Sequence, residues 1–418
     1  MYKKIILNLT FLFCLQRLVI AQNNNSPYSM YGIGDIEQSG FDRSSGMGHA
    51  GMALFSNRFL NNSNAASLAN LDDYFFNFEL ATRLKLVTYT GNPISSASGQ
   101  SSDMQIKKVS MAMKIKPKWG LSIGLQPYSN SNYSFFDTKN LIGNNSTLPA
   151  YYEGSGSINQ LYLAVGYKVS KSLSLGLQAS YLFGQLNQTE TLATGNGIDS
   201  SVITTRKAII GAPLLKPSFQ YTAKLNSKWK MFLGGTATLK TSLNPSYNLS
   251  VLYGSSTVST NSDFKTQDIV LPAQYAGSIA ARLKDKFTFA VDYSFQNWSD
   301  QNYKGISYQL INSRTFALGF EVSDKRTFKD LTFERQFFQT GVFINNSYLQ
   351  INGQQIGSYG ATIGYGTNFL RSNLGLQISL EAGKRGTTNV GLIEEAYGQL
   401  NFIFSYRDFW FVKVKRFD

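Results

Sequence analysis

The sequence predicts an all-β protein, a transmembrane antiparallel β-barrel of about fourteen strands with an N-terminal plug (hatch) inside the lumen. Three observations predict this class: an export signal, a composition poor in charge and rich in aromatic residues, and many segments with a strict period of two. Outer-membrane barrels combine these features because each strand turns one face to lipid and the other to the lumen.

Residues 1–21 have the layout of a secretory signal peptide. Two lysines precede the apolar run IILNLTFLFCLQRLVIA, which ends in a small residue. A membrane-spanning anchor is the alternative, but Asn8, Gln16 and Arg17 interrupt a segment already close to the minimum spanning length. Cys14 is the only cysteine and lies inside this segment, so the mature chain has no disulfide or thiol chemistry.

The composition favours β-structure that faces lipid. Only 15% of the 418 residues are charged, whereas aromatic residues reach 14%, with 30 Phe and 24 Tyr; soluble domains carry about 25% charged residues. No later window offers the ~18 consecutive apolar residues of a spanning helix. Removal of the signal leaves 36 basic and 25 acidic residues, a charge of +11. These basic residues are dispersed over short turns, where they would meet lipid phosphates, so no nucleic-acid partner is predicted.

Alternation is the main evidence for the strands. Apolar residues fall on every second position in 173–183 and in 287–295, opposite small or polar residues. A soluble sandwich would show the same period, but its apolar face rarely carries so many aromatic residues. The expected strands are 74–89, 106–117, 119–135, 157–170, 172–190, 206–226, 229–245, 270–284, 286–299, 312–323, 336–350, 357–368, 373–385 and 394–415.

The connections predict an orientation. Short basic turns (116–120, 169–172, 226–229 and 284–286) alternate with long stretches rich in Asn, Ser, Thr and Gly (91–103, 130–157, 187–205 and 245–268). Outer-membrane barrels have short periplasmic turns and long outer loops. The expected number of strands is fourteen, to within two. Because an even number of strands returns the chain to the side on which it started, both termini are expected in the periplasm.

The region 22–73 precedes the first strand and has no sustained periodicity. It contains apolar residues such as Met47, Phe55 and Leu60, which a free tail does not need. A barrel of this size is wide enough to need filling or to conduct. We therefore expect a signal peptide at 1–21, a plug at 22–73 and a barrel at 74–418.

Several motifs resemble the FadL/TodX-type family of outer-membrane transporters, which carry long-chain fatty acids and aromatic hydrocarbons. SPYSMYGIGD (26–35), SSGMGHAGMAL (44–54) and NNSNAASLANL (61–71) are similar to the plug region of that family. Its Asn-Pro-Ala motif is matched by Asn64, Ala65, Ala66 and Ser67, except that Ala65 replaces the proline. The resemblance extends over the whole chain through four further motifs: SLGLQASYLFG (174–184), DYSFQNWSD (292–300), EAGKRGT (381–387) and FWFVKVKRFD (409–418).

The resemblance implies a fourteen-stranded barrel with a hatch in the bacterial outer membrane. It also implies passive uptake of hydrophobic or amphiphilic small molecules, with lateral exit beside a kinked third strand. Pro127 is the candidate for the kink, because proline cannot donate to the ladder of an interior strand. The alternative is that Pro127 already lies above the membrane, at the start of a long loop.

Charged residues on the polar faces of the strands are expected in the lumen. They are Glu79, Arg83, Lys85, Asp292, Glu381 and Arg385. Such charges pair with one another or with the plug backbone, or a basic subset holds the carboxylate of an amphiphile.

Catalysis is not predicted. His49 is the only histidine, which excludes a multi-histidine metal site, and we expect it to pack or hydrogen-bond within the hatch. There is no phosphate-binding glycine loop between a strand and a helix, and no cofactor or metal is expected.

Two function classes therefore remain open. The first is a passive transporter of hydrophobic small molecules, surrounded by outer-membrane lipid and lipopolysaccharide. The second is a barrel of the same fold that binds an unidentified protein partner in another envelope complex, such as a secretion machine. Fold alone does not distinguish them.

Overall fold

The computed structural model describes residues 26–38, 40–91, 99–140, 147–194, 201–261, 269–301, 303, 305, 307–328, 331–369 and 373–410. The predicted signal peptide, 1–21, lies outside these residues. No helix in the described ranges is long and apolar enough to cross a membrane.

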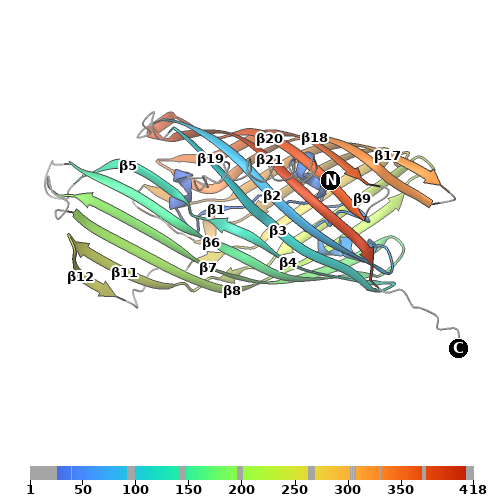
Figure 1. Cartoon of the computed structure of the whole chain (residues 1–418), viewed down its shortest axis with the longest axis horizontal. Helices are drawn as coiled ribbons and strands as arrows, with labels where there is room; N and C mark the ends of the chain where they lie inside the picture. The colour runs from blue at the N-terminus through green and yellow to red at the C-terminus, as the bar shows by residue number, and fades with distance from the viewer. Residues whose placement is uncertain are drawn as a thin grey trace, which may run out of the picture.

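The described residues form a closed antiparallel barrel of fourteen strands, as predicted (Figure 1). The barrel strands are β2 (Phe75–Gly91), β3 (Gln100–Lys116), β4 (Trp119–Asn130), β6 (Thr147–Lys168), β7 (Leu173–Ala193), β8 (Ser201–Lys224), β9 (Trp229–Thr238), β14 (Gln274–Leu283), β15 (Phe287–Gln296), β17 (Ser313–Phe328), β18 (Leu331–Ile351), β19 (Gln354–Asn368), β20 (Leu374–Gly386) and β21 (Ile393–Phe409). The barrel closes where β2 pairs with β21 along its whole length, from Phe75↔Phe409 to Gly91↔Ile393. Closure at β2 and β21 removes the two terminal edges of the sheet.

Shorter elements lie before and between these strands. They are η1 (Pro27–Met30), β1 (Asp35–Ile36), η2 (Arg43–Gly46), η3 (Ala65–Asn70), β5 (Tyr133–Asn140), β10 (Thr241–Ser242), β11 (Ser246–Tyr253), β12 (Ser256–Asn261), β13 (Val270–Leu271), η6 (Ser299–Gln301), β16 (Tyr308–Leu310) and η7 (Asn389–Gly391).

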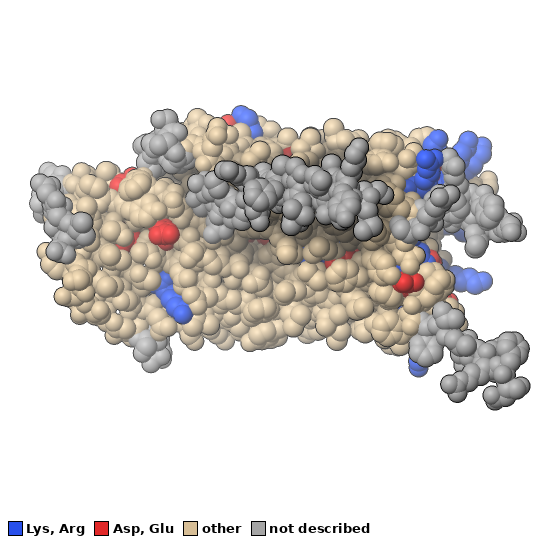
Figure 2. Space-filling view, viewed as in Figure 1, with Lys and Arg blue, Asp and Glu red and all other residues tan. Residues whose placement is uncertain are grey.

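The two faces of each strand meet different surroundings. On β7, Leu177 is 49% exposed on the outside, whereas its neighbour Gln178 is 3% exposed on the inside. Figure 2 shows a broad middle band with few charged side chains and a gathering of Lys and Arg at the end where β21 finishes. The apolar face of the alternating pattern is therefore the lipid-facing surface of the barrel.

The long polar stretches differ from expectation. Much of the predicted loops 130–157, 187–205 and 245–268 is strand, because β5 with β6, β7 with β8, and β11 with β12 continue as paired hairpins. In Figure 1 these strands project at the end opposite the short turns. Beyond the lipid both faces of a strand can be polar, so the ladder persists while the apolar alternation disappears.

Four predicted strands are shorter than expected at their outer ends. The expected strands 270–284 and 286–299 are reduced there to β14 and β15. The expected strand 119–135 divides at 131–132, between β4 and β5, and the expected strand 229–245 ends at Thr238. The sequence does not mark either break because polar residues continue through both. The second break lies beside the part of β8 that contains Pro213, whose carbonyl accepts a hydrogen bond from the Thr241 hydroxyl.

The segment Ser26–Leu71, called the plug segment below, packs against inward-facing barrel residues. Its η3 lies against three strands at glycines, because a Cβ at Gly120, Gly166 or Gly176 would come within 2.1–2.7 Å of its backbone. Glycine is needed here because the plug backbone touches the wall directly. This part of the interior is therefore occupied by the N-terminal segment.

Candidate functional site

Strands β3 and β4 pair over only part of their length among the described residues. Their ladder ends at Val109↔Leu125. Beyond this point residues 100–108 of β3 pair with β2 on the other side, and residues 126–130 of β4 pair with β6. The facing edges of the two strands therefore separate, and we call this stretch the seam.

The plug segment occupies the β4 edge of the seam. Ile36 of β1 pairs with Ser129 of β4 in antiparallel register. The backbone N–H of Glu37 donates to the carbonyl of Tyr128 at 2.9 Å. A short piece of the plug thus takes the place that β3 would hold in a continuous wall.

The Glu37 carboxylate joins the two sides of the seam. It accepts a hydrogen bond from Lys107 on β3, and Arg83 Nη1 on β2 lies 3.4 Å from its Oε2. Asn130 Nδ2 on β4 lies 3.4 Å from its Oε1. Buried charges need their partners to stay in place. If the plug segment moved away from the seam, Lys107 and Arg83 would lose Glu37, and a strongly charged opening would remain.

Pro127 lies two residues beyond the last β3–β4 pair. It is within β4 rather than in a loop, and the β4–β6 ladder shifts register between Pro127 and Ser129. A bulge of this kind bends a strand and raises its twist. The position of the proline therefore coincides with the point where the two strands diverge.

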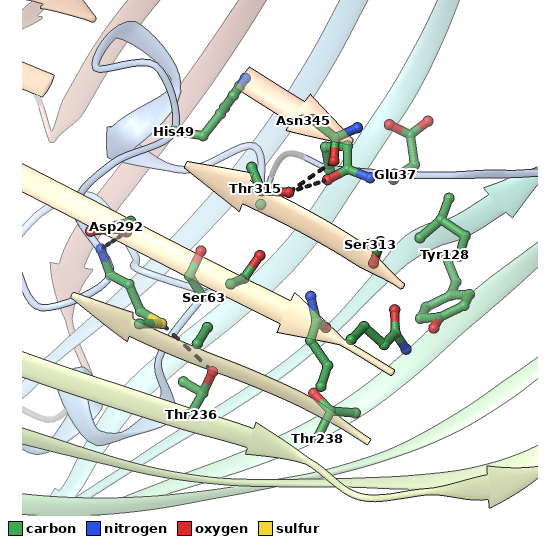
Figure 3. Close-up of a pocket in the computed structure, with 18 of the residues that line it drawn as sticks. Glu37, His49, Ser63, Tyr128, Thr236, Thr238, Asp292, Ser313, Thr315 and Asn345 are labelled. Carbon is green, nitrogen blue, oxygen red and sulfur yellow. Dashed lines mark hydrogen bonds between the residues drawn. The ribbon is translucent and has the colours of Figure 1, made fainter. Parts of the chain in front are cut away.

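A cavity of about 260 Å³ opens beside the seam, and Pro127 and Glu37 line it (Figure 3). Its wall is largely polar, with side chains such as Gln160, Thr236 and Ser313 directed into it. Lys216 also lines the cavity. Its Nζ donates to the carbonyl of Asn62 in the plug segment at 3.5 Å. No carboxylate of the described residues lies within 4.0 Å of it.

Five of the six predicted lumenal charges contact the plug segment. Glu79 accepts from Leu60 N–H at 2.7 Å, Arg83 meets Glu37, Asp292 accepts from Gly51 and Met52 N–H at 3.0 and 2.9 Å, Glu381 meets His49, and Arg385 Nη1 lies 2.7 Å from Asp35. The sixth, Lys85, has its Nζ 4.8 Å from the centre of the Tyr397 ring. These charges mainly bind the plug to the wall.

The predicted hatch residues have distinct local roles. His49 adopts a left-handed φ of 69°, and its Nε2 lies 2.9 Å from Glu381 on β20, so it binds the wall rather than the hatch alone. Asn64 caps η3, accepting from the Ala66 N–H at 3.0 Å. Ala65 begins η3, and Ser67 Oγ donates to the Asn61 carbonyl at 3.2 Å. An Asn cap satisfies one of the free N–H groups at the start of such a turn without a proline.

Arg43 makes contacts with the wall that were not predicted from the sequence. Its guanidinium makes four hydrogen bonds of 2.6–2.9 Å, two to Glu321 and two to Glu334, and it lies 4.0 Å from the centre of the Phe337 ring. Bidentate contacts of this type are the strongest that a guanidinium makes. They fix η2 of the plug to β17 and β18.

Lys107 and Lys108 were also missed. Both are buried, although neighbours in a regular strand face opposite sides, because the β2–β3 register shifts beside them. Lys108 Nζ lies 2.7 Å from Glu79. Two adjacent lysines interrupt the alternation of apolar and polar residues in this strand, and this interruption indicates the bulge.

Comparison with known proteins identifies one family. The family model described as BamG matches residues 1–418. No curated protein matches the chain.

Solved structures with a similar fold include a FadL homologue, a toluene transporter and a hydrocarbon channel. A FadL homologue from Pseudomonas aeruginosa is 14% identical over 90% of this chain and 100% of its own, with a TM-score of 0.60. The toluene transporter TodX from P. putida is 13% identical (90% and 99%; TM-score 0.57). The monoaromatic hydrocarbon channel CymD is 12% identical (90% and 98%; TM-score 0.53). At this identity the likeness shows a FadL-like fold.

Proposed function

The chain belongs to the BamG family, and on its FadL-like barrel we propose that it is an outer-membrane channel for passive uptake of amphiphilic or hydrophobic small molecules. The proposal includes lateral exit through the seam between β3 and β4, with both termini in the periplasm. The observation that carries it is the early end of the β3–β4 ladder, with a plug strand in the vacated position.

The lining of the cavity favours an amphiphile over a plain hydrocarbon. Apolar ligands select apolar pockets with few polar groups, whereas this cavity is lined mainly by amide, hydroxyl and charged side chains. Lys216, without a carboxylate partner among the described residues, is suited to an anionic head group such as a carboxylate. A long-chain fatty acid is therefore the probe of choice.

The test uses a reversible lock on the seam. The mature chain has no cysteine if the signal is removed, so I36C together with S129C would provide one thiol pair at positions that face each other in the β1–β4 ladder. Opposed residues in an antiparallel ladder lie about 4.5–5.5 Å apart at Cα, which suits a disulfide. Uptake of a labelled long-chain fatty acid is measured in cells that produce the oxidised or the reduced variant.

We expect uptake to fall at least fivefold when the disulfide is formed and to recover after reduction, with each single-cysteine variant as a control. Unchanged uptake with a fully formed disulfide would exclude exit through the seam. A Lys216→Met variant should lower fatty-acid uptake and leave toluene uptake unchanged, which separates recognition of the head group from passage.

A second candidate is that the barrel serves as a binding partner of another envelope complex. The observation that favours it is the anchoring of the plug by Arg43 and by the lumenal charges, which suits a barrel that stays closed. Purification of the tagged full chain from gently solubilised membranes separates the two candidates. A stoichiometric protein partner, together with no uptake of fatty acid or toluene by the unmodified protein, would favour this second role.

A further inference from the structure

The lipid-facing surface of the barrel is hollowed at one place. The hollow lies across β8, β9, β14 and β15, has a volume of about 620 Å³ and is lined almost entirely by apolar atoms. It lies on the outer face of the wall, and a ligand bound there would not take part in transport through the lumen. We call it the lipid-facing groove.

Strand register explains the groove. Gly235 on β9 is directly opposite Gly277 on β14, and both positions face outward. Phe219 pairs with Gly235 on one side, and Tyr293 pairs with Gly277 on the other. The Phe219 ring covers Gly235, whereas Gly277 stays open, so the floor of the groove lies at Gly277 between the rings of Phe219 and Tyr293.

The next outward-facing row forms the upper end of the groove. Ala237, Tyr275, Phe295 and Arg314 follow one another across β9, β14, β15 and β17. Tyr275 and Phe295 line the groove, and the Arg314 guanidinium carbon lies 5.9 Å from the centre of the Phe295 ring. Arg314 is exposed on the outer surface, above the apolar floor.

Lys240 is a second exposed cation, in the segment that follows β9. No ion pair within 4.0 Å joins Arg314 or Lys240 to a carboxylate in the described ranges. This row lies at the ends of β9, β14 and β15 that are away from the short turns 226–229 and 284–286. In the proposed orientation these ends meet the outer leaflet.

We propose that the lipid-facing groove binds an acyl chain of lipid A while Arg314 binds its phosphate. The apolar lining matches a hydrocarbon chain in chemistry. Because lipid tails are as apolar as the groove, preference for one lipid comes from packing and from the phosphate contact. Arginine binds phosphate in bidentate fashion. The arrangement of groove below and cation above follows the order of chain and phosphate in a lipid of the outer leaflet.

The chain offers a matched pair of substitutions. A Cβ at Gly277 would meet nothing within 4 Å, so Gly277→Leu fills the groove without disturbing the wall. Gly398 on β21 is also free of neighbours within 4 Å, and it pairs with the exposed Leu86 on an outward-facing row away from the groove. Gly398→Leu is therefore the control, and Arg314→Gln tests the phosphate contact separately.

The experiment is native mass spectrometry of the full chain in detergent, titrated with diphosphoryl lipid A or with phosphatidylglycerol. Heat-modifiable migration on gels confirms that each variant is folded. We expect one lipid A to bind per chain, at least tenfold tighter than phosphatidylglycerol. Gly277→Leu and Arg314→Gln should each weaken binding at least fivefold, and Gly398→Leu should leave it unchanged.

Three results would overturn the proposal. Equal binding of both lipids with no effect of Arg314→Gln would mean an acyl groove without phosphate recognition. Equal weakening by Gly398→Leu would mean general lipid adhesion. A co-purifying protein released by Gly277→Leu would assign the groove to a protein contact instead.

Discussion

Arg43 holds two carboxylates at once, so its removal leaves Glu321 and Glu334 without their shared cation in a largely buried site. Breaking one side of such a buried arrangement typically costs about 3–5 kcal/mol. Glu321 retains a hydrogen bond from Gln339 Nε2 at 2.7 Å, which does not replace the lost charge.

We therefore predict that Arg43→Ala lowers the free energy of unfolding by about 3 kcal/mol or more. The measurement is urea unfolding of the purified chain in detergent. Arg58→Ala is the matched control, because Arg58 lies in the same segment and its Nη1 donates to the Leu374 carbonyl rather than to an acid. Equal losses for the two variants would contradict the anchoring role of Arg43.

At the scale of elements, η3 and β7 meet without an intervening side chain. A Cβ at Gly176 would lie 2.2 Å from the backbone N of Ala66. Backbone cannot move aside as a flexible side chain can, and overpacking of this kind typically costs about 1–3 kcal/mol.

We expect Gly176→Val to displace η3 while the barrel still closes. The plug segment should then be cut by trypsin at Arg43 or Arg58 at least tenfold faster than in the unmodified chain. Gly398→Val serves as the comparison, since no atom lies within 4 Å of that position. Unchanged cleavage of the Gly176 variant would show that the plug is held by the ion pairs alone.

The divergence of β4 from β3 belongs to the same scale. Valine at position 127 would restore a backbone N–H and a residue suited to a regular strand. We expect Pro127→Val to extend the regular wall at the seam and to lower uptake of labelled fatty acid severalfold at equal surface expression. Pro213→Val, in β8 and away from the seam, should have little effect. Unaffected uptake in both variants would remove Pro127 from the proposed exit.

At the scale of the whole molecule, the short turns lie at one end and the long hairpins at the other (Figure 1). A tag inserted between Gly254 and Ser255, in the turn of the β11–β12 hairpin, should bind antibody on intact cells. The same tag at the Pro117–Lys118 turn should bind only after permeabilisation. The reverse result would invert the orientation on which the outer-leaflet lipid site depends.

Local patterns were enough to predict much of the molecule. The alternation in β7 and β15 assigned the lipid-facing side of each strand, because a period of two is a property of neighbouring residues. The strand number and the short basic turns followed from the same reading. The polar hairpins β5–β6 and β11–β12 were missed, because outside the lipid a strand needs no apolar face and keeps only its backbone ladder.

The sequence by itself determined the barrel, the face of each strand that meets lipid and six of the charges that face the lumen, since each depends on local period and composition. The tertiary structure decided which charges meet. Glu37 reaches Lys107 and Arg43 reaches Glu321 only when distant segments are brought together. It also decided that β1 takes the edge of β4, and that two glycines from different strands lie side by side in the lipid-facing groove. Register between strands fixes such contacts, and register is set by the closure of the whole barrel.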